Sequence, residues 1–360
     1  MYKVKEGGRY NMYMLNAQMN KRIDWIDISK GIGVILLVIG HMPSIPYVIQ
    51  NWIYSFHMPL FFFLSGYTFK IKDSVKDNLK KMFRRLIIPY LIYNVIFLLS
   101  DVILFGRKST TVNADLNDMI SGQGSFGVIW FLLSLFWVQI IYLVVSAITN
   151  NYKNVKFANI VIVLLVLSGY VIATYCKMDL YKLVTSLVAV GFFCLGNIFM
   201  KLKILDKIKQ MSILFLFLCT NIIFGYINLI LYGTRIEMSG AVYNNLFITF
   251  VAAIAGIIFV NGVSEKLSML NLWVVKCLKY IGKNSLYFFV LTAYIPVRMM
   301  QLLEGSELDN LLVKIISKIL GFVLTYVVVE VLSHIKKKYH KFICEKRLDK
   351  WSYNKCKTRL

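Results

Sequence analysis

The sequence is poor in charged residues and in proline. Charged residues make up only 16% of the 360 residues and hydrophobic residues 58%, whereas a soluble globular chain averages about 25% charged and about 45–50% apolar. Five prolines and 21 glycines are too few for a collagen-like or linker protein, and so apolar a chain would not stay solvated as a disordered coil. A soluble fold is excluded, and the length allows one domain of several membrane spans.

Acidic residues are also scarce, with 18 Asp and Glu against 41 Lys and Arg and a formal net charge of +23. A nucleic-acid binder would gather its cations on one exposed face or helix. Here the cations fall in short clusters between apolar runs. We therefore expect membrane lipids, and no nucleic acid, among the partners.

Paired cysteines and a signal peptide are missing as well. The six cysteines show no paired spacing, so neither a disulfide framework nor a metal site is expected, and we interpret them as reduced. Residues 1–20 contain no apolar core of the signal-peptide type and no small-residue cleavage site, so we expect this segment to be retained. Met12, Met14 and Met19 are alternative natural starts.

Long apolar runs are what the sequence has in abundance. A bilayer core of about 30 Å requires about 20 mainly apolar residues in a helix. Ten stretches meet this need, at approximately 26–42, 51–69, 86–106, 126–148, 157–175, 182–200, 211–232, 243–262, 284–303 and 311–333. We expect an all-α integral membrane protein of about ten transmembrane helices. The first span is the weakest by hydropathy, because Asp27 and Lys30 lie in its opening turns.

The cations between the spans predict the orientation, because Lys and Arg are retained on the cytoplasmic side. With the N-terminus inside, the inner segments hold 32 of these residues and the outer segments five. Both termini are therefore expected to be cytoplasmic. The expected divisions are a basic N-terminal segment at 1–25, a ten-helix membrane domain at 26–333 and a basic tail at 334–360.

The sequence also allows predictions for two loops and for one arginine within a span. The polar stretch 107–127 is the longest outer loop and could cap a site from outside, and 263–283 suits a short amphipathic helix on the inner leaflet. Arg298 lies within the ninth span, where Glu304 or Glu307 could be its partner.

Ionisable side chains within membrane spans are costly and point to functional sites. Lys30 and His41 are eleven residues apart, which at about 100° per residue places them on one helix face, about 16 Å apart along the axis. Asp27 lies three residues before Lys30, where it either pairs with the ammonium group or caps the helix. This stripe would fit an elongated substrate with an anionic cytoplasmic end and a reactive outer end.

Each of these residues also has a purely structural interpretation. Lys30 could extend to the inner headgroups and His41 could lie in the outer interface. His57 precedes Met-Pro, where a histidine can bond to a backbone carbonyl freed by the kink. Arg84 and Arg85 could be ordinary anchors on the cytoplasmic side. Their arrangement on one stripe favours a functional role for Lys30 and His41.

The stretch RIDWIDISKGIGVILLVIGHM, followed by FHMPLFFFLSGYTF, resembles the opening of the membrane-bound acyltransferase family 3, which includes sugar O-acetyltransferases of the fucose 4-O-acetylase type. The family motif of Arg or Lys, ten residues and then His corresponds to Lys30 and His41. The resemblance is specific over 22–90, where Phe61 to Tyr67, Arg84, Arg85, Leu86, Pro89 and Tyr90 also match. Less specific matches further on are Trp130, Phe131, Leu132 and Gly282 to Leu286. The resemblance spans residues 22 to about 333, and Thr292 stands where many relatives have a histidine.

The resemblance implies transfer of an acyl group, usually acetyl, from cytoplasmic acyl-CoA to a hydroxyl of a cell-surface or exopolysaccharide sugar. Acetyl-CoA would be a co-substrate, with no bound cofactor. Lys30, Arg84 and Arg85 would bind the CoA nucleotide. The protein would lie in the cytoplasmic membrane of a bacterium. The acceptor sugar, the length of the acyl group and the oligomeric state stay open.

In the implied mechanism, His41 is the general base that takes the proton of the acceptor hydroxyl. Asp27 would fix the position of Lys30. His57 or Ser65 would orient the imidazole or donate to the developing oxyanion. A covalent acyl-histidine relay is an open alternative.

Two functions of other classes compete with this one. A transporter or flippase of lipid-linked oligosaccharide would also have many spans, but its polar groups belong in broken helices near the midplane of two related halves. Here the polar groups concentrate in the first three spans. A membrane sensor would need an output domain, which the sequence does not suggest.

Overall fold

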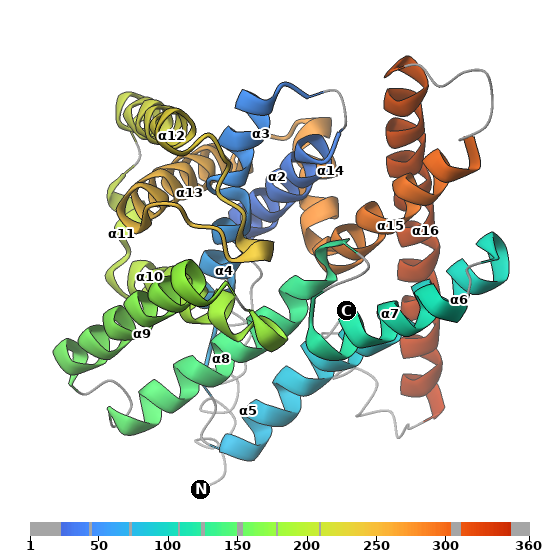
Figure 1. Ribbon diagram of the computed structural model, residues 1–360, viewed down its shortest axis with the longest axis horizontal. Coiled ribbons are helices and arrows are strands. Elements are labelled where there is room, and N and C mark those ends of the chain that lie inside the picture. Colours follow the sequence, from blue (N-terminus) through green and yellow to red (C-terminus); the bar gives the residue numbers. More distant parts are fainter. Residues whose placement is uncertain are drawn as a thin grey trace, which may run out of the picture.

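The computed structural model describes residues 23–42, 45–71, 74–106, 109–123, 127–149, 154–177, 179–208, 210–303 and 311–346. This part of the chain is helical (Figure 1), with one isolated bridge between Glu237 and Val242. In chain order the elements are α2 (Asp24–Gly40), α3 (Tyr47–Tyr54), α4 (His57–Tyr67), α5 (Val75–Met82), η1 (Phe83–Ile87), α6 (Ile88–Phe105), α7 (Ser109–Ser121), η2 (Gly127–Ile129), α8 (Trp130–Ile148), α9 (Val155–Cys176), η3 (Leu180–Lys182), α10 (Leu183–Leu202), α11 (Ile204–Lys207), α12 (Met211–Tyr232), η4 (Met238–Gly240), α13 (Leu246–Ser268), α14 (Trp273–Lys283), α15 (Ser285–Leu303) and α16 (Leu311–Lys346).

Seven helices in the described part of the chain are long and apolar enough to cross a membrane. They are Val75–Leu104, Gly127–Ile148, Val155–Cys176, Leu180–Leu202, Met211–Tyr232, Leu246–Ser268 and Lys314–Tyr339. The predicted all-α membrane fold is confirmed at this level. Three predicted spans are not among these seven. α2 has 17 residues, the second span is divided into α3 and α4, and the ninth corresponds to α15, a continuous helix of 19 residues that contains Pro296.

Helix α2 lies at the centre of the bundle, packed against α14, α13, α4 and α15 (Figure 1). Its crossing with α14 brings backbone against backbone. A Cβ added to Gly31 would lie 2.3 Å from the Leu278 carbonyl oxygen, and one added to Gly282 would lie 1.7 Å from the Asp27 oxygen. The amphipathic helix expected in 263–283 is α14, which buries Val275, Leu278 and Ile281 and leaves Trp273 and Val274 exposed.

A second crossing of the same kind joins α4 to α10. A Cβ on Gly66 would lie 1.9 Å from the Phe193 carbonyl oxygen, and one on Gly196 would lie 2.0 Å from the Phe63 oxygen. Small residues at a crossing let helix backbones approach closely in a membrane, where the apolar lipid supplies no hydrophobic driving force between helices. These two crossings fix α2 and α4, which carry most of the predicted site residues.

Three local expectations can be compared with the structure. Residues 109–121, within the expected outer loop, form the helix α7. The last span and the start of the tail are one continuous helix, α16, which runs to Lys346. Arg298 pairs with the buried carboxylate of Asp101 on α6, because α15 packs with that residue facing α6, and Glu304 and Glu307 lie outside the described residues.

The α4–α10 crossing can be tested by adding a single methyl group. We expect Gly196→Ala to lower stability by about 2 kcal/mol, because the new methyl would overlap the Phe63 carbonyl and overpacking typically costs about 1–3 kcal/mol. The measurement is thermal unfolding in detergent, followed by fluorescence-detected size exclusion. Gly225→Ala in α12 is the matched control, since its nearest neighbours lie 3.8 Å away. Equal melting temperatures for the two variants would refute the close crossing.

Candidate active site

Two polar cavities lie near the positions of Lys30 and His41. The first, the cationic cavity, has a volume of about 230 Å³. It is lined by Lys30, Phe61, Ser65, Thr68, Phe69, Lys81, Met82, Arg85, Leu86, Phe131, Leu132, Leu135, Gln139, Ser285, Leu286 and Phe289. Three of these side chains are cationic and none is acidic, so the cavity suits an anionic group.

A turn of π-helix shapes one wall of the cationic cavity. In η1 the backbone N–H of Ile88 bonds to the carbonyl of Phe83, and such single-turn π-bulges are frequent at functional sites. Both arginines of this turn are exposed. Arg85 lines the cavity, whereas its neighbour Arg84 does not. Sequence reasoning missed Lys81, although its spacing of four residues from Arg85 places both on one helix face.

The second cavity, the histidine cavity, has a volume of about 180 Å³. It is lined by His41, Tyr54, His57, Met58, Gly127, Val128, Trp130, Glu237, Met238 and Ser239. Among the residues of the predicted outer loop 107–127 that the structure describes, Gly127 contributes to this lining. His41 follows directly after α2, and His57 opens α4 beyond the break with α3. The structure therefore brings the two predicted histidines into one space.

Backbone hydrogen bonds fix the proton positions on both imidazoles. Nδ1 of His41 lies 2.8 Å from the Leu37 carbonyl oxygen, and Nδ1 of His57 lies 2.9 Å from that of Ile53. A carbonyl oxygen only accepts hydrogen bonds, so each Nδ1 carries a proton. In the neutral rings, Nε2 is then a lone-pair acceptor, the form a general base requires. His57 thus makes the backbone bond expected of a structural histidine while lining the cavity.

Tyr54 lies between the two histidines and is a residue that sequence reasoning missed. Its hydroxyl donates to Nε2 of His41 at 3.2 Å, and its ring centroid lies 5.7 Å from that of His41 and 5.0 Å from that of His57. The Arg235 guanidinium stacks over the Tyr54 ring at 4.0 Å and is held by Glu237 at 3.1 Å. The sequence offered little indication that Tyr54 and Arg235 would meet, because Arg235 lies in a loop 181 residues after Tyr54.

A buried ion pair anchors the loop that closes the histidine cavity. Lys182 is 2% exposed; its ammonium lies 3.4 Å from the Asp179 carboxylate and donates to the Ser239 carbonyl at 2.8 Å. Asp179 also accepts from the backbone N–H groups of Val184 and Thr185 at the start of α10. From its position, Lys182 was expected only as an outer-loop cation.

The remaining predicted residues are distributed as follows. Ser65 lies with Lys30 in the cationic cavity, apart from the two histidines. Asp27 is buried where α2 meets α14, with its backbone carbonyl facing Gly282. Within the described ranges, no group of three or more His, Cys, Asp or Glu side chains is placed to hold a metal ion.

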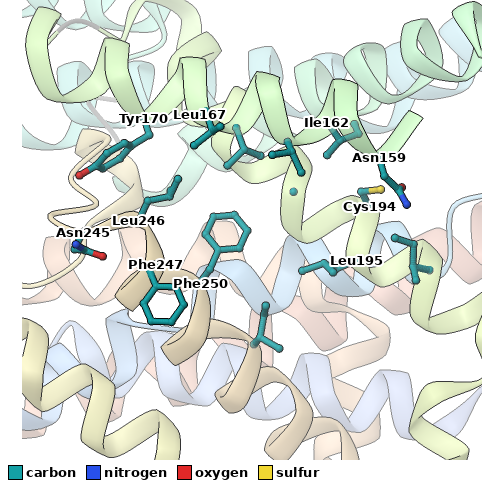
Figure 2. A pocket seen from close by; sticks show the side chains of 15 residues that line it. Asn159, Ile162, Leu167, Tyr170, Cys194, Leu195, Asn245, Leu246, Phe247 and Phe250 are labelled. Carbon is teal, nitrogen blue, oxygen red and sulfur yellow. The ribbon is translucent and has the colours of Figure 1, made fainter. Parts of the chain in front are cut away.

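A third cavity has a different character. It is an apolar groove of about 740 Å³ between α9, α10 and α13. Figure 2 shows Tyr170 and Asn245 near one end and Asn159 near the other, with Ile162, Leu246 and Phe250 among the apolar side chains that line it. No charged residue lines this groove, so it offers nothing to hold an anionic substrate.

The fold and the two polar cavities define a multi-pass membrane protein with a cationic site and a histidine site beside its central helix. Residues 23–333 match the acyltransferase domain of one such class. The chain belongs to the membrane-bound acyltransferase family 3.

A curated relative is nodulation protein NolL of Mesorhizobium japonicum, which is 28% identical to this chain over 185 residues. The aligned region covers 44% of this chain and 48% of the relative, so the match spans about half the length of each. No solved structure matches the chain.

The role of the Asp179–Lys182 ion pair can be tested by removing the charge of Asp179. We expect Asp179→Asn to lower stability by about 3 kcal/mol, because the Lys182 ammonium would remain buried without a counter-charge. The control is Asp24→Asn, which removes an ion pair to Lys279 whose aspartate is 53% exposed and is expected to cost less than about 1 kcal/mol. The measurement is the melting temperature of each variant in detergent. Similar decreases in melting temperature for the two variants would contradict the anchoring role of the Asp179–Lys182 pair.

Proposed function

We propose that this protein transfers an acetyl group from cytoplasmic acetyl-CoA to a hydroxyl of a cell-surface or exopolysaccharide sugar. The observation that carries the proposal is that the two ends of α2 lie at two different cavities, one lined by cations at Lys30 and the other by the imidazoles of His41 and His57. The proposal includes ten membrane passages, both termini in the cytoplasm and a place in a bacterial plasma membrane. The cationic cavity then faces the cytoplasm and the histidine cavity faces the acceptor.

The cationic cavity would bind the donor. Lys30, Lys81 and Arg85 line it, and charge-assisted bonds from such groups to phosphate oxygens are stronger than neutral ones. Arg84 adds positive charge near the entrance without lining the cavity. Asp27, one helical turn from Lys30, supports α2 from its buried position against α14. No metal or bound cofactor takes part in the proposed reaction.

The histidine cavity would hold the reacting groups. Nε2 of His41 takes the proton of the acceptor hydroxyl, whose oxygen attacks the thioester carbonyl carbon. The C–S bond breaks, and the CoA thiolate takes the proton back from the imidazolium to leave as the free thiol. The Tyr54 hydroxyl, which occupies Nε2 in the resting structure at 3.2 Å, would give way to the acceptor and donate to the developing oxyanion.

His57 and Ser65 have different places in this scheme. His57 packs its ring against Tyr54 and so supports the geometry around His41. Ser65 lines the cationic cavity and not the histidine cavity. Its hydroxyl would therefore donate a hydrogen bond to the acyl-CoA rather than act on the imidazoles. Flipping of a lipid-linked oligosaccharide, the competing function, has less support, since the family is one of acyltransferases.

The base can be tested by replacing its imidazole. We expect His41→Gln to lower kcat by about 10²–10⁴-fold, which is the usual contribution of general base catalysis. The measurement is transfer of labelled acetyl from acetyl-CoA to glycan by the purified protein. His334→Gln, at an exposed histidine of α16, is expected to keep the native rate. Native activity in His41→Gln would eliminate the proposed mechanism.

The donor site can be tested with two neighbouring arginines. We expect Arg85→Gln to raise the KM for acetyl-CoA about tenfold or more, because it removes a charge-assisted hydrogen bond worth about 1.5–3 kcal/mol. Arg84→Gln removes the same charge outside the cavity and is expected to change KM about twofold at most. Equal effects of both variants would mean that general surface charge, rather than the cavity, attracts the donor.

A further inference from the structure

The histidine cavity and the cationic cavity are separated by a wall to which α4 and α8 contribute. Met58 on α4 lines the histidine cavity, whereas Phe61, less than one helical turn further on, lines the cationic cavity. On α8, two neighbouring residues line different cavities: Trp130 lines the histidine cavity and Phe131 lines the cationic cavity. The two spaces therefore approach each other closely without being continuous in this structure.

Three phenylalanine rings occupy this wall. The ring centroid of Phe131 lies 6.0 Å from that of Phe61 and 5.1 Å from that of Phe289, and the Phe61 and Phe289 centroids lie 5.5 Å apart. Each ring thus contacts the other two, and they come from the separate helices α4, α8 and α15. Phe61, Phe131 and Phe289 are at most 7% exposed. We refer to these three rings as the aromatic partition.

The partition is also in close contact with the central helix. A methyl group added to Gly33 of α2 would lie 2.9 Å from the Phe61 ring. Gly33 stands between Lys30 and His41 in the sequence. The partition therefore crosses the stripe that links the proposed donor and base sites.

Building on the proposed function, we infer that Phe61, Phe131 and Phe289 determine which acyl group is transferred. The nucleotide of the donor stays among the cations, so its acyl thioester reaches His41 only by passing between these rings. The rings are in mutual contact in this structure, so they must move apart for an acetyl group to pass, and each further methylene requires a larger displacement. One methylene is typically worth about 10–200-fold in discrimination by an apolar site. The rings also keep the histidine cavity separated from the cytoplasm when no donor is bound.

The separation can be tested without any acyl transfer, by cysteine labelling in sided membrane vesicles. In a chain whose six native cysteines are replaced, Gln139→Cys reports on the cationic cavity and Ser239→Cys on the histidine cavity. A membrane-impermeant anionic methanethiosulfonate is expected to reach them from opposite sides. Adding Phe289→Ala is expected to make Ser239→Cys at least tenfold more reactive from the side that labels Gln139→Cys.

The matched control is Phe192→Ala, which removes an equally buried ring that stacks on Phe250 away from both cavities. It is expected to leave the labelling pattern unchanged. Phe61→Leu is a milder opening of the partition for use if Phe289→Ala does not fold. The inference is overturned if Ser239→Cys is labelled equally from both sides in the native background, or if opening the partition leaves its labelling unchanged.

The effect on the acyl group is measured as the ratio of kcat/KM for butyryl-CoA to that for acetyl-CoA. We expect Phe289→Ala to raise this ratio at least tenfold and Phe192→Ala to leave it unchanged. An unchanged ratio in Phe289→Ala would remove the specificity role. If the native protein transfers no acyl group from either donor, the proposed function fails, while the labelling result still decides whether the partition separates the cavities.

Discussion

Direct contact between helix backbones is the constraint on which the site depends. Gly31 and Gly282 seat α14 on α2, and Gly66 and Gly196 seat α10 on α4, with each glycine facing a carbonyl of the other helix. In a bilayer the hydrophobic effect does not draw apolar helices together, so close packing and hydrogen bonding must do so. Because Lys30 and Ser65 each lie one residue from a crossing glycine, these contacts set where the cationic cavity forms.

Ion pairs and hydrogen bonds complete what close packing begins. The loop after α12 buries Ile236, Met238 and Tyr243 in the core. It is also held by Lys182 and by the Arg235–Glu237 pair. Arg235 links this loop to the site, because its guanidinium lies over Tyr54 and Tyr54 bonds to His41. The imidazole environment thus depends on residues from three distant parts of the chain.

Helical periodicity explains which parts of the site could be predicted. It placed Lys30 and His41 on one face, and the two residues line the two cavities of the structure. The same arithmetic, applied to α4, sets Ser65 about 12 Å along the axis from His57, which agrees with their lining different cavities. Tyr54 and Arg235 were not predictable in this way, because their contact depends on how α3 and a distant loop fold together. The charge of Lys182 marked an outer segment in the sequence but is buried in the fold.

The central position of α2 has a consequence for how the protein is made. This helix carries Asp27 and Lys30, which disfavour its insertion into lipid as an isolated segment. Its backbone partner α14 begins at Trp273 and is therefore synthesised some 250 residues later. This early helix completes its packing only after most of the chain has been translated. A truncated chain that ends before α14 would leave α2 without that partner, and quality-control proteases would have a reason to recognise it.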